Sequence, residues 1–243
     1  MIKSRLNLRN VATVIACLTV TMFASCKKDP TPDPIFLLEE RQVGTERYVY
    51  EYDDQNRLTK RSRYENGILQ GVDIFKYDPD GHLEELEYGN LKHTFTKNGD
   101  KITFDYHGVL AEIELNAQGH FVKRKSVNEY SKSTQTFTWQ NGNLTKVEAE
   151  YENIHDAGTW TRTYTHDNKK SPFYYCKTPK WVLWLWLVAE EYNENNIETV
   201  ETIDEVEGDD YYEHEYTYNT DGLPTKRTAS WGGEPTTYKY MKR

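Results

Sequence analysis

Aromatic and apolar residues alternate with polar ones over most of the chain, and the alternating runs end in short clusters of Asp, Asn and Gly. In the segments 45–53 and 147–151, one face of an extended strand can therefore pack while the other meets water. Aromatic residues two positions apart lie on the same face of a strand. Asp, Asn and Gly adopt turn conformations that other residues resist. The pattern predicts β-hairpins, and helix signals are weak.

The alternating runs form an internal repeat. In each copy, two aromatic or apolar residues flank one other residue and are followed by a polar turn and another apolar residue. Copies lie at 50–58, 75–83, 113–121, 137–144, 164–173 and 216–223, and further turn signals lie at 65–67, 88–90 and 97–100. The simplest topology is an antiparallel meander, which must curl or leave exposed edges. We expect an all-β, water-soluble fold of tandem hairpins that curls into a barrel or half-barrel.

The repeat is interrupted by the segment 171–179 and then by the apolar run 181–189, which contains Trp181, Trp184 and Trp186. This run is too short to cross a membrane as a helix, and as a strand it would be apolar on both faces. It should be buried on both sides, as a plug or strand inside the curled sheet. The alternative is that its Trp residues contact a ligand or partner.

The N-terminus has the organisation of a secretory signal peptide. Basic residues precede an uncharged apolar run over 11–23, which is shorter than the roughly 20 residues that a membrane-spanning helix needs. Ala24 and Ser25 then precede Cys26, which resembles the lipobox of bacterial lipoproteins, in which the cysteine is acylated and becomes the first residue after cleavage. That resemblance implies a signal peptide over 1–25 and a lipid on Cys26. The alternative is a secreted protein cut near Cys26.

Between this cysteine and the first repeat, Pro residues over 27–34 indicate an extended tether. We assign 26–43 to the lipid anchor and tether and 44–243 to a single hairpin-repeat domain, which is long enough for one sizeable core. The net charge of the chain is −9, and loss of the three basic residues in 1–25, which holds no acidic residue, makes it −12. Such an acidic surface repels phosphate backbones, so nucleic acid is a poor candidate partner.

Recognisable catalytic and cofactor motifs are missing from the sequence. Its seven His residues show neither a His-Glu-x-x-His spacing nor a pairing with Cys, and no Gly-rich phosphate loop or Gly-x-Ser-x-Gly elbow occurs. Cys176 would be the one thiol of the mature chain, and we expect it to be packed rather than reactive. The acidic stretch 198–215 is expected to be a solvated hairpin tip, with a cation site as the alternative. We therefore expect no enzyme, no cofactor and no metal site.

The Tyr-x-Tyr-Asp and Gly-x-Leu units resemble the YD repeats of RHS-type proteins. Taken with the lipobox, the segments 168–173 and 216–226 resemble a family of Bacteroidetes lipoproteins of unknown function with a porin-like fold, and the match runs from about residue 44 to the end. The resemblance implies a curled antiparallel sheet at the cell envelope, with no catalytic or binding residues to carry over. A bilayer-embedded barrel needs an outward apolar band, whereas these strands place charged residues and Thr on one face.

These observations predict a cell-envelope lipoprotein that is held by the lipid on Cys26, in the outer membrane, with the leaflet left open. We expect a non-catalytic binding or interaction module, because Tyr and Trp faces suit a glycan, a peptide or an envelope protein. The candidate contact residues are Trp181, Trp184, Trp186 and Trp231. The alternatives are a purely structural envelope role, a glycan-acting enzyme whose paired carboxylates the sequence does not reveal, and a membrane-embedded barrel.

Overall fold

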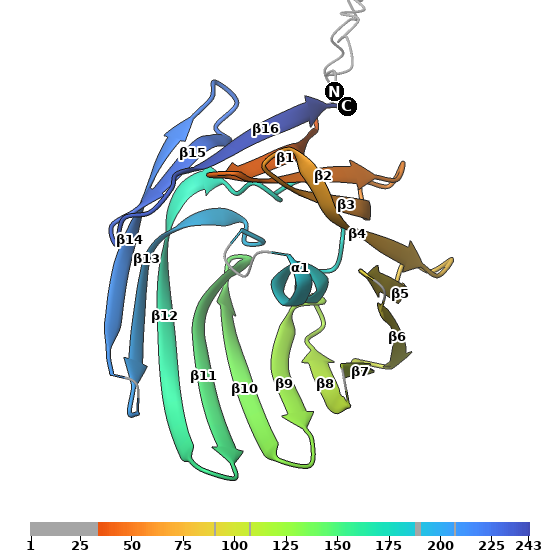
Figure 1. Cartoon of the computed structure of the whole chain (residues 1–243), viewed down its shortest axis with the longest axis vertical. Coiled ribbons are helices and arrows are strands. Elements are labelled where there is room, and N and C mark those ends of the chain that lie inside the picture. The colour runs from red at the N-terminus through yellow and green to blue at the C-terminus, as the bar shows by residue number, and fades with distance from the viewer. Residues whose placement is uncertain (1–33, 90, 107, 188–190, 207) are drawn as a thin grey trace, which may run out of the picture. The chain divides into compact units, whose positions relative to one another are not determined.

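The computed structural model describes residues 34–89, 91–106, 108–187, 191–206 and 208–243 (Figure 1). These residues form 16 β-strands and one short α-helix. The elements are β1 (Phe36–Val43), β2 (Glu46–Tyr52), β3 (Leu58–Glu65), β4 (Ile68–Tyr77), β5 (Leu83–Tyr88), β6 (Leu91–Asn98), β7 (Lys101–Tyr106), β8 (Val109–Leu115), β9 (Phe121–Val127), β10 (Ser131–Gln140), β11 (Asn143–Asn153), β12 (Ala157–Lys170), α1 (Lys180–Trp186), β13 (Asn195–Asp204), β14 (Asp210–Tyr218), β15 (Pro224–Ala229) and β16 (Thr236–Lys242). In this part of the chain, no helix is both long and apolar enough to cross a membrane.

Each strand pairs in antiparallel fashion with its neighbours in sequence, and β1 also pairs with β16, which closes the sheet into a barrel. At one end of this seam Phe36 lies opposite Lys242, and the amide of Arg243 donates to the carbonyl oxygen of Ile35 at 2.9 Å. Closure leaves no free edge among the 16 described strands, because each of them has a partner on both sides. The predicted all-β meander of hairpins and its curling into a barrel are confirmed.

The barrel begins earlier in the chain than the sequence predicted. The sequence pattern places the anchor and tether at 26–43, whereas β1 occupies Phe36–Val43. Leu37 and Leu38 are each 1% exposed, so their burial rather than the preceding prolines decides where the fold starts. The signal peptide over 1–25, the anchor Cys26 and the tether as far as residue 33 lie outside the described residues.

The sequence repeat is a turn motif. In four copies the Asp or Asn that starts the turn accepts a hydrogen bond at 2.8–3.0 Å from the backbone amide four residues later. The third residue after this Asp or Asn has a positive φ. It is Asn56 in the first copy and Gly in the other three. This conformation favours Gly and Asn. The four turn-starting residues are Asp53, Asp78, Asn116 and Asn219.

The turns of the repeat all lie at one end of the barrel, because alternate connections of a meander share an end. We call this the plug end, since it also holds the described residues between β12 and β13 (171–187 and 191–194), together with the first and last described residues. The repeat copy at 164–173 leads into this segment instead of into a hairpin turn.

We call the opposite end of the barrel the distal rim. It consists of the connections at 43–46, 65–68, 88–91, 106–109, 127–131, 153–157, 204–210 and 229–236.

The helix α1 lies inside the barrel and plugs it (Figure 1). Trp181, Val182 and Leu183 are at most 2% exposed and join one core cluster with inward-facing aromatic residues of the strands. The predicted plug is confirmed, although the run is helical instead of extended. A closed barrel offers no edge to pair with, so the backbone of the run must satisfy its own hydrogen bonds. Accordingly the amide of Leu187 donates to the carbonyl oxygen of Leu183 at 3.1 Å.

Glu191 ties the plug segment to the barrel wall. Its side chain is 2% exposed, and its Oε1 accepts hydrogen bonds from Arg41 at 3.1 Å and from the hydroxyl of Tyr238 at 2.7 Å. The guanidinium of Arg227 lies 3.7 Å from the same oxygen. Burial raises the pKa of Tyr238, and the nearby Glu191 carboxylate adds to this effect. Because these partners lie on β1, β15 and β16, one carboxylate fixes the plug to the strands of the closing seam.

A second buried ion pair holds the C-terminal end of α1. The guanidinium of Arg61 lies 2.5 Å from the carboxylate of Asp73 and also donates to the carbonyl oxygen of Trp186 at 2.8 Å. Burial raises the pKa of Asp73 even though Arg61 is adjacent. The last turn of α1 is therefore positioned by β3 and β4 through a charged contact that is shielded from water.

The outer faces of the strands are polar. They carry cross-strand ion pairs, as the alternating pattern predicts. Such exposed pairs contribute at most about 1 kcal/mol each, so they mark the outer face as hydrated rather than stabilise the fold. Examples are Lys60 with Glu51 at 2.8 Å, Lys76 with Glu85 at 2.5 Å, Lys101 with Glu112 at 3.0 Å and Lys132 with Glu152 at 2.6 Å.

Candidate functional site

Three of the four predicted contact residues lie together inside the barrel. The ring centroid of Trp181 is 5.2 Å from that of Phe95, and the ring of Trp184 is 5.2 Å from that of Phe121. Trp186 belongs to the same cluster and is partly buried. The helix distributes these side chains along the core, and the ring of Trp186 reaches Tyr88, at the distal end of β5, with a centroid distance of 6.1 Å.

Trp231 lies apart from the other three, on the connection between β15 and β16 at the distal rim. It is 62% exposed. One side of its ring is nevertheless held, since Tyr212 meets it edge to face at 4.4 Å and His214 lies at 5.4 Å. Trp231 therefore presents a fixed apolar surface to solvent.

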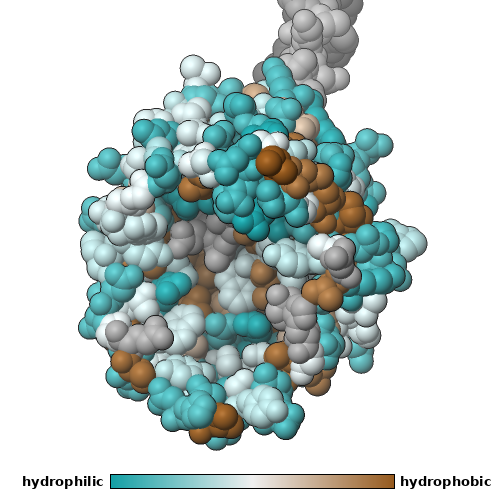
Figure 2. All heavy atoms as spheres, in the orientation of Figure 1, coloured by the Kyte–Doolittle hydropathy of each residue, from teal (hydrophilic) through white to brown (hydrophobic). Residues whose placement is uncertain are grey.

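Exposed large apolar residues gather at the distal rim. Among the described residues, only Tyr174 belongs to this exposed class and lies elsewhere, at the plug end. Figure 2 shows apolar groups in brown along the lower edge of the molecule, where Figure 1 places the ends of the β9–β10 and β11–β12 hairpins. The rim residues lie in the connections of the distal rim or directly next to them: Ile68, Leu69, Tyr88, Leu91, Leu110, Val127, Tyr130, Ile154, Ile203, Val206, Tyr211 and Trp231.

The distal rim is also acidic. Its connections contain no Lys or Arg in the sequence. The acidic stretch 198–215 forms β13, β14 and the tip between them, which confirms the expectation of a hairpin tip. Carboxylates thus stand between the apolar side chains around the opening. Exposed examples are Glu129, Asp156, Glu205, Asp209, Asp210 and Glu234.

A cavity of about 430 Å³ opens at the plug end. Its floor consists of buried apolar side chains from β5, β6, β7 and α1, including Phe95, Ile102, Trp181 and Leu183. Its mouth is lined by polar residues from three turns and from the segment 171–194. Pockets for small molecules commonly have this size and this combination of an apolar interior with a few polar groups.

The mouth of the cavity is basic, although the chain as a whole is acidic. Lys97, Lys177 and Lys180 line it, together with His82, His120 and a single carboxylate, that of Glu194. This carboxylate is already paired with Lys180 at 3.0 Å. Burial lowers the pKa of His120, and the charge of Lys180 lowers it further.

His82 connects a carboxylate to a lysine at this mouth. The Nδ1 of His82 is 3.0 Å from Oδ2 of Asp78, and its Nε2 is 2.8 Å from Nζ of Lys97. An ammonium group has hydrogen atoms to donate and no lone pair to accept with. The Nε2 atom of His82 therefore accepts from Lys97, and Nδ1–H donates to Asp78. Lys97 is thereby held at the cavity by a neutral ring.

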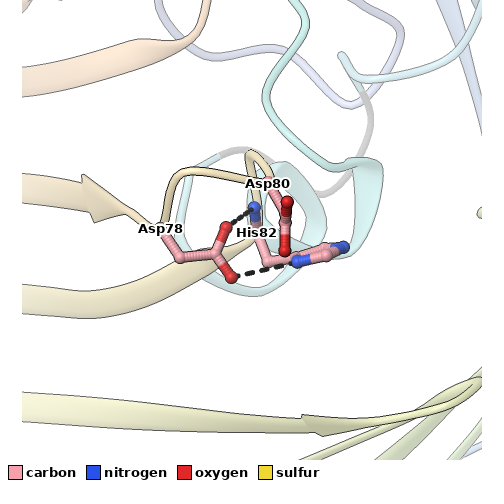
Figure 3. A group of neighbouring side chains, drawn as sticks. All are labelled: Asp78, Asp80 and His82. Carbon is pink, nitrogen blue, oxygen red and sulfur yellow. Dashed lines mark hydrogen bonds and ion pairs between the residues drawn. The ribbon is translucent and has the colours of Figure 1, made fainter.

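Asp78, Asp80 and His82 place one ligand-type atom each within 4.8 Å of one another (Figure 3). The oxygens of Asp78 are already used, because Oδ1 accepts from the His82 amide at 2.8 Å and Oδ2 contacts the imidazole. These contacts are those of the repeated turn motif. The group is thus accounted for as a turn cap that orients His82.

Cys176 also lines the cavity. Burial raises the pKa of its thiol to about 11, so the thiol is protonated at neutral pH. The thiolate is the nucleophilic form of cysteine, and this environment disfavours it. The packed thiol that the sequence predicts is confirmed.

Comparisons with known proteins identify no relative by sequence: no family model matches the chain, and no curated protein is similar to it. Among solved structures, the chain is similar to one described as a porin-like protein from Bacteroides uniformis ATCC 8492. The two share 12% sequence identity with a TM-score of 0.49, over 85% of this chain and 95% of that chain. The fold of the present chain, an all-β antiparallel barrel, follows from its own strand pairing. The sequence resemblance to a lipoprotein family stays a prediction.

Sequence reasoning found Trp231 but missed the rest of the distal rim and the cavity mouth. The rim residues occupy alternate turns that are far apart in sequence, so nothing in a local window links them. A signal did exist, since the connections at one end combine apolar residues with a complete lack of Lys and Arg. The cavity mouth required knowledge of which turns share an end with the plug segment.

Proposed function

We propose that this protein is a lipid-anchored, non-catalytic interaction module of the cell envelope that docks a partner protein on its distal rim. The observation that carries the proposal is the concentration of exposed apolar side chains on that rim. Large exposed apolar areas mark interaction surfaces, and aromatic residues are enriched in such surfaces. Trp231 and Tyr130, at 62% and 58% exposure, are the expected anchors.

The charge of the rim indicates the chemistry of the partner. With carboxylates between its apolar residues and no Lys or Arg on its connections, the rim complements a surface that is basic as well as apolar. An anionic lipid surface is a poorer match, because the same carboxylates would be repelled by it. The rim also lies at the end opposite to Pro34, where the tether joins the barrel.

The ion pairs on the outer faces of the strands argue against an embedded barrel. Lys146 and Glu148 pair at 2.6 Å on the outward face of β11, away from both ends of that strand. A lysine facing lipid at the bilayer centre costs about 2–4 kcal/mol in an outer-membrane barrel. We infer that water surrounds the barrel and that lipid on Cys26 supplies the membrane attachment.

The attachment is tested by Cys26→Ser. We expect this variant to move from the membrane fraction to the soluble fraction, because it removes the acylated thiol and leaves the barrel unchanged. The measurement is an immunoblot of fractions after washing with high salt and with carbonate. Cys176→Ser is the matched control and should stay with the membrane. Tight membrane association of Cys26→Ser would instead support an embedded barrel.

Docking on the rim is tested by photo-crosslinking in cells. A photoreactive residue at position 154 or 231 should give one defined adduct, whereas the same residue at position 174, on the plug end, should not. Adding Leu110→Ser and Val206→Ser, which leave the core intact, should reduce the adduct at position 154 at least tenfold. Because the contact pairs opposite charges, its yield should also fall as salt is raised.

Equal adducts at positions 154, 231 and 174 would contradict docking on the rim, as would an adduct that survives both serine substitutions. If none of the three positions gives an adduct, the purely structural envelope role is favoured.

A further inference from the structure

We propose that the cavity at the plug end is a binding site for a small amphiphile with an apolar body and one anionic head group, such as a carboxylate or a phosphate. This site is separate from the distal rim and lies at the opposite end of the barrel. The proposal rests on the shape of the cavity and on the distribution of charge at its mouth.

The apolar body is accommodated by the floor of the cavity. Phe95, Ile102, Trp181 and Leu183 are each at most 8% exposed, and all of them line the same space of about 430 Å³. A cavity bounded by such residues favours an alkyl or aromatic group, because each CH₂ that enters it is removed from water. An ionic or sugar ligand without an apolar part would leave this floor unused.

The head group is recognised at the mouth. Lys97 and Lys177 have no carboxylate partner among the described residues, whereas lysines on the outer faces, such as Lys60 and Lys132, pair with glutamates. The carboxylate of Glu194 is occupied by Lys180. Two uncompensated ammonium groups at the entrance of an apolar cavity, on a chain of net charge −9, form a local site for an anion.

His82 holds Lys97 ready for that anion. Its Nε2 accepts from the ammonium at 2.8 Å, and Asp78 fixes the ring from the other side. An ammonium group carries three hydrogen atoms, so Lys97 can keep its contact with His82 and still donate to a head group. In the repeat copy that contains Asp78 and His82, the turn motif therefore positions Lys97.

The test uses the secreted Cys26→Ser protein and isothermal titration calorimetry with octanoate, octanol, acetate and inorganic phosphate. Octanoate should bind at least tenfold more tightly than octanol, which has the same chain without a charge. Acetate and phosphate, which lack the apolar body, should bind at least tenfold more weakly than octanoate. Lys97→Met combined with Lys177→Met should weaken octanoate binding about tenfold while octanol binding changes less than twofold.

Lys60→Met combined with Lys132→Met removes two charges from the outer faces and is the matched control, which should leave octanoate binding unchanged. Circular dichroism of all variants verifies the fold. Equal binding of octanol and octanoate would overturn the anionic head group, and binding of neither would overturn the site. Loss of octanoate binding in the control variant would show a general charge effect and would also overturn it. Each of these failures leaves the rim proposal intact, because crosslinking there reports the other end of the barrel.

Discussion

Replacing Glu191 with Ala is expected to lower the free energy of unfolding by about 3–5 kcal/mol, because it leaves two buried guanidinium groups without their shared carboxylate. Arg41 is 3.1 Å from this carboxylate and Arg227 is 3.7 Å from it, and both side chains are 11% exposed. Tyr238 also loses its hydrogen-bond acceptor. The measurement is urea denaturation followed by far-ultraviolet circular dichroism.

Glu194→Ala is the matched control, since Glu194 lies in the same segment and also pairs with a basic residue, Lys180. Its side chain is 40% exposed, so its loss should cost less than about 1 kcal/mol. Glu191→Gln keeps a hydrogen-bond acceptor for Tyr238 but removes the charge. Its loss of unfolding free energy should lie between those of Glu191→Ala and Glu194→Ala. Equal effects of Glu191→Ala and Glu194→Ala would mean that Glu191 does not anchor the plug.

Trp181→Ala is expected to cost about 3–5 kcal/mol as well, through loss of a large buried side chain and the cavity that it leaves. Trp181 is 2% exposed and packs against Phe95 in the centre of the plug. The same denaturation measurement applies. Trp231→Ala provides the control, because a substitution at an exposed position usually changes stability by no more than about 0.5 kcal/mol.

The two Trp variants also separate stability from docking. Trp231→Ala should weaken the crosslink at position 154 while the unfolding midpoint stays in place. A stability loss at Trp231 as large as that at Trp181 would indicate that the rim Trp is part of the core, and would remove it as a docking anchor.

Local sequence chemistry predicted the hairpins because each turn is encoded within a few residues. Asp78 accepts from an amide four residues away, and Gly81 adopts the positive φ that the turn needs. Leu83, the apolar residue that follows, is 4% exposed and begins the next stretch of core. Such short-range determinants are visible in one sequence, and so the meander was predictable.

The plug helix and the start of the barrel depended on distant partners. The sequence of Trp181–Leu187 predicts a strand that is buried on both faces. In the closed barrel, however, no strand edge is available for it to pair with. Likewise Phe36–Val43 follows a Pro-rich segment and lacks the repeat, and its role as a strand comes from pairing with β16 at the far end of the chain. Contacts between residues so far apart in sequence cannot be predicted from the local pattern of apolar and polar residues.

The candidate sites were predictable only in part. Trp231 was identified because a large aromatic beside two glycines is conspicuous in sequence. The rim around it and the lysines of the cavity mouth come from turns on many hairpins, and only the alternation of ends in the meander collects them. Lys97 and Lys177 are separated in sequence by the strands β7 to β12 and line the same opening in space.

The plug also restricts how many strands the barrel can have. Each hairpin contacts only its neighbours along the meander, so gene duplication or deletion could add or remove a whole hairpin with little change to local pairing. The plug does not scale in the same way, because α1 fits one width of barrel. The carbonyl oxygen of Trp186 accepts from Arg61 on β3, and the ring of Trp184 packs against Phe121 on β9. Evolution of this architecture is therefore expected to couple hairpin number to the length and bulk of the segment between β12 and β13.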